Sequence, residues 1–237
     1  MIESEEIELK DDFKFAFKNT IPVMLGYLFM GMAFGILYQK AGYNAVWAFF
    51  TALFVYAGSM QFMLVDLLTR GMGPLYTLLI TLSVQCRHMF YGLSFIEDFK
   101  QMGKKAFYMI FSLTDETYSL LWSVNTEGYN KKRVRFFIAL LDHSYWIAGC
   151  TLGAALGTLI KFNVTGVDYA MTALFIVIFT EQWLTAEKHG PAMIGVIVGL
   201  VFIVLLGEDK FLLPALIISV LALVYKSKKE DAENAGD

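Results

Sequence analysis

The chain contains a series of long apolar runs that are separated by short polar segments. The runs lie at about 20–38, 44–69, 74–96, 104–124, 134–160, 167–185, 191–207 and 210–225. A helix needs about 20 residues to cross the hydrocarbon core of a bilayer, and the first six runs reach or nearly reach this length. The runs lack the polar–apolar alternation of membrane β-strands, which excludes a closed barrel. The pattern predicts an all-α, polytopic membrane protein with about eight transmembrane helices. The last two runs are short and form either a tight helical hairpin or one partly re-entrant element, which gives seven spans.

The composition agrees with this fold class. Hydrophobic residues make up 57% of the 237 residues and charged residues 17%, so a water-soluble domain would expose large apolar patches. We expect a tail at 1–19, either an interfacial helix or a flexible segment, then a transmembrane domain at 20–225 and a solvated, disordered tail at 226–237. The lipid bilayer is the expected partner. Basic residues are too scattered to predict nucleic-acid binding.

The distribution of Lys and Arg predicts the orientation. With eight spans both termini share one side, which carries twelve of these residues, while the opposite side carries six. The positive-inside rule then places both termini in the cytoplasm. The cluster Lys100, Lys104 and Lys105 falls on the opposite side and argues against this arrangement. The first twelve residues are acidic and lack an apolar stretch, so we expect a retained first span and no cleavable signal peptide.

Ionisable residues lie in the middle of two successive runs. Arg87 and His88 interrupt the run 74–96, and Asp115 and Glu116 interrupt the run 104–124. Charged groups inside a bilayer are costly and usually face a bundle interior that forms a substrate or ion path. The run 104–124 is expected to form one helix, and its polar side chains then fall within an arc of about 100°. They are Tyr108, Ser112, Asp115, Glu116, Ser119 and Ser123. This stripe then faces the stripe that contains Arg87 and Tyr91.

This arrangement predicts a proton-coupling role for Asp115, Glu116 and His88. Arg87 would stabilise one carboxylate as an ion, and the second carboxylate, held beside a like charge in low dielectric, would carry a proton. The alternative is a buried ion pair that only fixes helix packing.

The run 44–69 contains the segment Tyr56-Ala57-Gly58-Ser59-Met60-Gln61-Phe62, whose polar groups do not share one helical face. Local unwinding at 57–59 would explain this, with Ser59 as the N-cap of a half-helix whose free N–H groups point at an anionic group. The alternative is a continuous helix with Gly58 at a close crossing. The predicted substrate-binding residues are Tyr56, Gly58, Ser59, Gln61, Arg87 and Tyr91.

Three glycine pairs or triplets spaced by four residues predict close helix packing. They are Gly149, Gly153 and Gly157, then Gly31 and Gly35, then Gly195 and Gly199. Cys86, Cys150 and His143 are expected to be core residues. The three histidines form no pair with metal-ligand spacing, so we expect no metal, no cofactor and no enzymatic activity.

Three segments together resemble the AzlC family of branched-chain amino acid export permeases. They are residues 56–62, quoted above, then Arg87-His88-Met89-Phe90-Tyr91-Gly92, and Leu113-Thr114-Asp115-Glu116. A looser match is Ser144-Tyr145-Trp146 with Gly149 and Gly153. The resemblance covers nearly the whole chain. It implies a multi-pass permease of the inner membrane of a prokaryote that expels neutral amino acids with the proton gradient. It also implies a small second membrane subunit of the AzlD type. Asp142 and Glu181 are not part of the family's pattern.

Three alternatives remain at this point. The protein is a channel or carrier for another small solute or ion, or an intramembrane enzyme, or an assembly subunit that is inert without its partner. The mixed charges of the two polar stripes favour a carrier over a pore, which would show rings of one charge.

Overall fold

The computed structural model describes residues 2–159, 176, 179–180, 183–184, 189–207 and 211–234, and the regular elements in these ranges are α-helices. The chain divides into two compact units. The first combines Met1–Gly73 with Val84–Thr172, and the second combines Pro74–Ser83 with Ala173–Asp237. Within the described part, one helix, Ile7–Lys40, passes both the length and the hydropathy criteria for crossing a membrane. The expected run 167–185, including Glu181, lies almost wholly outside the described residues.

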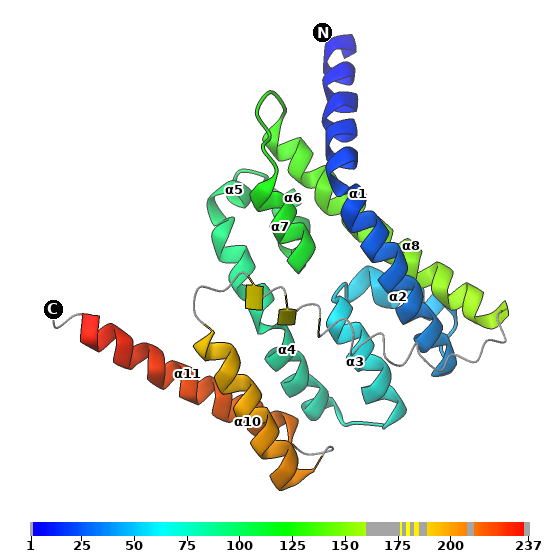
Figure 1. Ribbon diagram of the computed structural model, residues 1–237. Coiled ribbons are helices and arrows are strands. Elements are labelled where there is room, and N and C mark those ends of the chain that lie inside the picture. The colour runs from blue at the N-terminus through cyan, green and yellow to red at the C-terminus, as the bar shows by residue number, and fades with distance from the viewer. Residues whose placement is uncertain are drawn as a thin grey trace. The chain divides into compact units, whose positions relative to one another are not determined.

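Two long helices form the frame of the first unit. Helix α1 (Ile2–Lys40) and helix α8 (Lys131–Leu159) lie side by side and run in the same direction (Figure 1). Their glycines allow this contact: a Cβ added at Gly35 would lie 2.1 Å from the backbone oxygen of Cys150, and one at Gly153 would lie 2.2 Å from that of Met32. The expected close packing of the glycines in these two helices is confirmed.

The first part of α1 is a packed helix and not a flexible tail. Helix α1 is continuous from Ile2, with Pro22 inside it. Asp12 is buried and its carboxylate lies 2.7 Å from the Nε of Arg133 at the start of α8. Phe13 packs edge-on against Phe137, also in α8, with ring centroids 5.4 Å apart. The expected boundary near residue 19 therefore does not coincide with a break in the structure.

The run 44–69 forms two helices instead of one. Helix α2 (Ala45–Phe54) and helix α3 (Gly58–Thr69) are separated by three non-helical residues, 55–57. The longer of the two, α3, has 12 residues and a length of about 18 Å, which is too short to cross the hydrocarbon core. The local unwinding inferred from the sequence is confirmed, whereas the single second transmembrane helix is not.

Both helices of this run pack along the same part of α1. The hydroxyl of Thr51 in α2 lies 3.1 Å from that of Tyr38. The ring of Phe62 in α3 packs against Phe34, with centroids 5.8 Å apart. Phe34 and Tyr38 are one turn apart in α1, so α2 and α3 contact the same stretch of α1. Helix α3 therefore runs back alongside α2. We refer to α2 and α3 as the first hairpin and to residues 55–57 as its tip.

Helix α4 (Pro74–Ser94) and the short helix α5 (Ile96–Lys100) come next along the chain. The run 104–124, which follows them, is also broken. It forms α6 (Lys105–Phe111) and α7 (Asp115–Ser123), which have 7 and 9 residues. The expected continuous fourth transmembrane helix is therefore wrong, and with it the single polar arc along that helix. The Thr114 hydroxyl accepts a hydrogen bond from the backbone N–H of Thr117, so Thr114 caps a new helix at this point.

The outer ends of α6 and α7 lie against the same turn of α8. The ammonium of Lys105, at the start of α6, lies 4.5 Å from the centre of the Phe136 ring. Arg135 donates a hydrogen bond of 3.3 Å to the carbonyl of Leu121, in the last turns of α7. We refer to α6 and α7 as the second hairpin and to residues 112–114 as its tip. The legs of this hairpin flank the beginning of α8, while those of the first hairpin flank the end of α1. Because α1 and α8 are parallel, the two hairpins approach the middle of the frame from opposite ends.

The described part of the second unit contains α10 (Gly190–Leu206) and α11 (Leu212–Asn234), which pack against each other. A tight helical hairpin agrees with this packing. Helix α11 continues through 226–234, so the described part of the expected disordered tail is helical. Within the described residues, a Cβ at Gly195 or Gly199 would meet nothing within 4 Å, and close packing at this pair is not found.

Candidate functional site

The tips of the two hairpins meet between α1 and α8. The ring of Tyr56, in the first tip, lies 6.1 Å from Phe111, which precedes the second tip. Tyr27 of α1 lies beside both tips, because its ring is 6.5 Å from Tyr56 and its hydroxyl is 2.6 Å from that of Thr114. Trp146 of α8 packs edge-on against Tyr27 at 5.3 Å. Two interrupted helices and two continuous ones thus converge on one region.

The first tip has an unusual backbone. Tyr56 is buried and has a φ of 39°, the one positive φ among the described residues other than glycine. Bulky side chains are strained in this left-handed region, and such strain clusters at functional sites. The φ value turns the chain so that α3 begins at Gly58. A Cβ at Gly58 would lie 3.3 Å from the Trp146 ring, so glycine allows the close approach of α3 to α8.

Helix α3 begins without a capping side chain. Its N-cap is Ala57 and not Ser59 as expected, and no described side chain bonds to the first N–H groups. The carbonyl oxygen of the Gln61 side chain instead accepts hydrogen bonds from the Ala57 N–H at 3.3 Å and from Trp146 Nε1 at 2.7 Å. The Nε2 group of Gln61 is buried and has no hydrogen-bond partner among the described residues. The positive end of α3 therefore carries unused donors at the meeting point.

Helix α7 has the opposite character at its amino end. Asp115 and Glu116 occupy its first turn, whereas the first turn of α3 holds no acidic residue. The Tyr27 hydroxyl donates to Oε2 of Glu116 at 2.8 Å, and the Glu116 side chain is exposed. Tyr91 of α4 donates a hydrogen bond to Asp115. One tip thus presents donors and the other presents carboxylates.

The polar residues of α4 and α7 face each other as the sequence suggests. Besides the bond to Asp115, Tyr91 stacks on Tyr118 of α7 at 4.5 Å. His88 is half-buried, with its ring 5.5 Å from Tyr91. The side chain of Arg87 lies outside the described residues, so the pairing inferred for it stays a prediction.

Asp142 is a buried carboxylate that the sequence reasoning did not assign to the site. It is fully buried in the middle of α8, and its Oδ2 accepts a hydrogen bond of 2.9 Å from Thr117. Its Oδ1 has no hydrogen-bond partner among the described residues. A signal was available, because Asp142 shares the helical side of α8 that carries Trp146 and the glycines expected to pack.

His143, next to Asp142, is the core histidine that the sequence predicts. Its Nε2 lies 3.3 Å from the carbonyl oxygen of Ala52, and its Nδ1 lies 3.0 Å from the Tyr108 hydroxyl. A carbonyl can only accept, so Nε2 carries a proton and donates to Ala52, while Nδ1 and the Tyr108 hydroxyl share the second hydrogen bond. Cys150 is likewise a buried, free core cysteine. The part of the chain that the structure describes contains no group of three or more side chains able to hold a metal ion.

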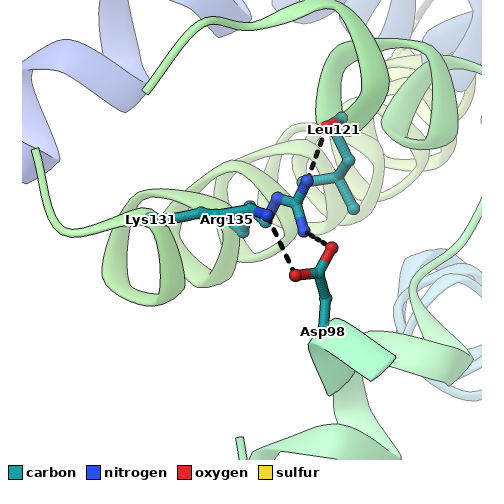
Figure 2. Close-up of polar contacts among 4 residues, drawn as sticks. All are labelled: Asp98, Leu121, Lys131 and Arg135. Atoms are coloured by element: carbon teal, nitrogen blue, oxygen red, sulfur yellow. Dashed lines mark hydrogen bonds and ion pairs between the residues drawn. The ribbon is translucent and has the colours of Figure 1, made fainter. Parts of the chain in front are cut away.

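Ion pairs close the outer end of the second hairpin (Figure 2). Asp98 of α5 accepts hydrogen bonds from Lys131 and Arg135 of α8, and Arg135 also reaches the carbonyl of Leu121. Partial burial favours a higher pKa for Asp98, but the hydrogen bonds and positive charges of Arg135 and Lys131 outweigh it and hold the pKa below its usual range. The start and end of the second hairpin are therefore fixed to each other.

Comparisons with known proteins give consistent matches. The family model described as AzlC protein matches residues 22–160. The chain is 39% identical to the branched-chain amino acid transport protein AzlC of Bacillus subtilis, over 90% of this chain and 85% of that protein. It is 40% identical to an uncharacterised membrane protein of Helicobacter pylori, over 92% and 96% of the two chains. The inner membrane protein YgaZ of Escherichia coli is 23% identical over 85% and 83%. No solved structure matches the chain significantly.

Proposed function

The chain belongs to the AzlC family, and from this premise we propose that it is a secondary transporter that exports branched-chain and other large neutral amino acids, driven by protons. The observation that carries the proposal is the meeting of two hairpin tips of opposite electrostatic character. A neutral amino acid is a zwitterion, with one carboxylate and one ammonium group. A site for it needs hydrogen-bond donors on one side and carboxylates on the other.

The first tip suits the substrate carboxylate. The N–H groups at the start of α3 have no capping side chain, and the helix dipole favours an anion there. Tyr56 belongs to this tip, and Gly58, Ser59 and Gln61 lie in the start of α3 that follows it. Tyr56, Ser59 and Gln61 are buried. Burial at this point means that the tip must move to admit a substrate. We propose these residues, with Arg87 and Tyr91, as the substrate-binding set.

The second tip suits the ammonium group. Asp115 and Glu116 place two carboxyl groups in the first turn of α7, where an ammonium group would find acceptors. One of them releases its proton when the ammonium arrives, which couples substrate to proton. His88, close to Tyr91, is proposed to assist this exchange. Met60, which is buried, and Met63 would receive the aliphatic side chain with the aromatic rings at the tips.

The hairpins also suggest a membrane topology. If the two hairpins re-enter, six of the eight apolar runs cross, and both termini remain on one side. Lys100, Lys104 and Lys105 then join the terminal side, and Arg70 leaves it. The counts of Lys and Arg become fourteen on the terminal side and four on the other. This asymmetry is larger than that for eight spans, and it supports a cytoplasmic location for both termini.

We further propose that the protein resides in the cytoplasmic membrane and works with a small membrane subunit of the AzlD type. We expect no cofactor, since exchange of protons and substrate across a gradient requires none. The test is reconstitution of the chain in vesicles, with and without the small subunit, under an imposed pH gradient. Labelled leucine, isoleucine and valine should move against their concentration gradient and saturate. Passive, non-saturable flux of ions or solutes would instead show a channel, and the proposal would be wrong.

A further inference from the structure

A continuous chain of hydrogen-bonded oxygens links two carboxylates in the first unit. It runs from Glu116 through the hydroxyls of Tyr27, Thr114 and Thr117 to Asp142. The four successive oxygen–oxygen distances are 2.8, 2.6, 3.2 and 2.9 Å. Each lies in or close to the range of a hydroxyl hydrogen bond. We refer to these five residues as the oxygen chain.

The two ends of the oxygen chain have different surroundings. The Glu116 side chain is exposed and lies at the amino end of α7. Asp142 is fully buried in the middle of α8, and no Lys or Arg among the described residues forms an ion pair with it. The three hydroxyls between them are also buried. The oxygen chain therefore joins a carboxylate with an exposed side chain to one that is fully buried.

Counting protons shows that all four contacts are hydrogen bonds only when one carboxyl of the oxygen chain is protonated. Four contacts need four bridging protons, and each of the three hydroxyls supplies one. The fourth proton must belong to Glu116 or to Asp142. With the proton on Glu116, every hydroxyl donates towards Asp142. With the proton on Asp142, every hydroxyl donates towards Glu116. The first arrangement keeps Thr114 as the donor to Thr117, as the structure has it, whereas the second reverses this contact and requires the two Thr hydroxyls to reorient.

We infer that the oxygen chain conducts the coupling proton between Glu116 and Asp142, and that Asp142 is its buried acceptor. The inference rests on the proposed function and extends it to a residue outside the family pattern. In one passage the O–H bond of Glu116 breaks, each hydroxyl gains one proton and gives up its own, and an O–H bond forms on Asp142. Total charge is conserved, and one negative charge moves from Asp142 to Glu116.

The groups around the oxygen chain favour this exchange. Burial without a cation favours the neutral form of Asp142. The ring nitrogens of His143, the neighbour of Asp142 in the sequence, bond to Tyr108 and Ala52 and not to Asp142. The titratable groups that face Asp142 are therefore acids or phenols: Glu116, Tyr27, Tyr56, Tyr108 and Tyr145. Asp115 adds another negative charge beside Glu116.

The experiment interrupts the oxygen chain at its middle. Thr117→Val removes the hydroxyl but keeps the shape, and Thr117→Ser keeps the hydroxyl. In vesicles that contain the full transporter, we measure leucine accumulation driven by a pH gradient and leucine-for-leucine exchange without one. For Thr117→Val and Asp142→Asn, the ratio of driven accumulation to exchange should fall about tenfold or more, and Thr117→Ser should restore it. Asp66→Asn, at an exposed carboxylate of α3, is the matched control and should leave the ratio unchanged.

A merely structural role would lower accumulation and exchange together, and this result would overturn the inference, as would an unchanged ratio. A second measurement distinguishes failure of this inference from failure of the proposed function. On acidification, the infrared spectrum of the wild type should gain the carbonyl band of a neutral carboxylic acid. Asp142→Asn should lack this band, and Asp66→Asn should retain it. If the wild type moves no amino acid, the proposed function fails. The band alone then decides whether Asp142 takes up a proton, and its absence overturns the inference.

Discussion

The Asp98 carboxylate and the Arg135 guanidinium form an ion pair although they lie 37 positions apart in the sequence, with the entire second hairpin between them (Figure 2). Lys131 bonds to the same carboxylate at 2.9 Å. A segment that crossed a bilayer would separate its two ends by about 30 Å. The ion pair therefore requires that the segment between α5 and α8 enters and leaves on one side of the molecule.

The first prediction concerns the membrane sides of the loops. In a cysteine-free background, single cysteines at Lys104 and Lys132, which are both exposed, should react with an impermeant maleimide from the same face. A cysteine at Lys40, at the end of α1, should react only from the other face. Labelling of intact cells and of inverted vesicles distinguishes the two faces. Reaction of positions 104 and 132 from opposite faces would show that 104–124 crosses the membrane.

The second prediction is a pH-dependent stability. Because the pKa of Asp98 is lowered in the folded protein, its ionised form stabilises the fold above the unfolded pKa of about 3.9. This contribution is lost as the pH falls through the lower, folded pKa. Asp98→Asn should thus lower the free energy of unfolding at neutral pH, and the difference from wild type should shrink below about pH 4. Denaturation in detergent over a pH series measures this difference. In an Arg135→Gln background the same substitution should have a smaller effect at neutral pH.

The third prediction tests the contact between α1 and α8. Gly35→Ala should lower the free energy of unfolding by about 1–3 kcal/mol, because its Cβ would overlap backbone atoms of Cys150 and Ala154. Gly195→Ala is the matched control, since a Cβ there meets nothing within 4 Å in the described residues. The control should be neutral or more stable by up to about 1 kcal/mol, as expected for glycine in a helix. Equal effects of both substitutions would contradict the packing argument.

The fourth prediction tests the carboxylate of the second tip. Glu116→Gln should abolish amino acid efflux driven by a pH gradient, because an amide carries no exchangeable charge. The fold should be retained, since the Gln oxygen can still accept from the Tyr27 hydroxyl. Glu127→Gln, at an exposed loop position, is the matched control. Driven efflux that persists in Glu116→Gln would remove this residue from the coupling mechanism.

The sequence predicts those features of the fold that depend on local spacing. Gly31 and Gly35 are four residues apart, as are Gly149 and Gly153. Helix faces with small residues at this spacing commonly pack closely against each other. The interruption near Gly58 was also predictable, because the polar groups of that run could not share one face of a continuous helix. The exact start of α3 was missed by two residues, because Ser59 resembles an N-cap while the left-handed Tyr56 sets the turn.

The interruption of the run 104–124 was missed for a physical reason. Its polar residues fit the spacing of a single helix. The same spacing arises when two shorter helices direct their polar side chains to the same side, so periodicity alone does not distinguish the two cases. The capping signal was nevertheless present, since Thr114 is followed at once by Asp115 and Glu116. Asp142 was missed because its partners, Thr117 above all, come from a distant part of the chain. Contacts between remote segments follow from the tertiary fold and not from local pattern.

The opposed approach of the two hairpins has a mechanical consequence. Neither tip is continuous with α1 or α8, and side chains such as Tyr27, Gln61 and Trp146 hold the tips between these two helices. If the region where the tips meet is the substrate site, as proposed, withdrawing one tip would expose it on the side of that hairpin while the other tip stays in place. Such a protein would alternate its exposure through two small, separate gates, and its long helices would not need to rock.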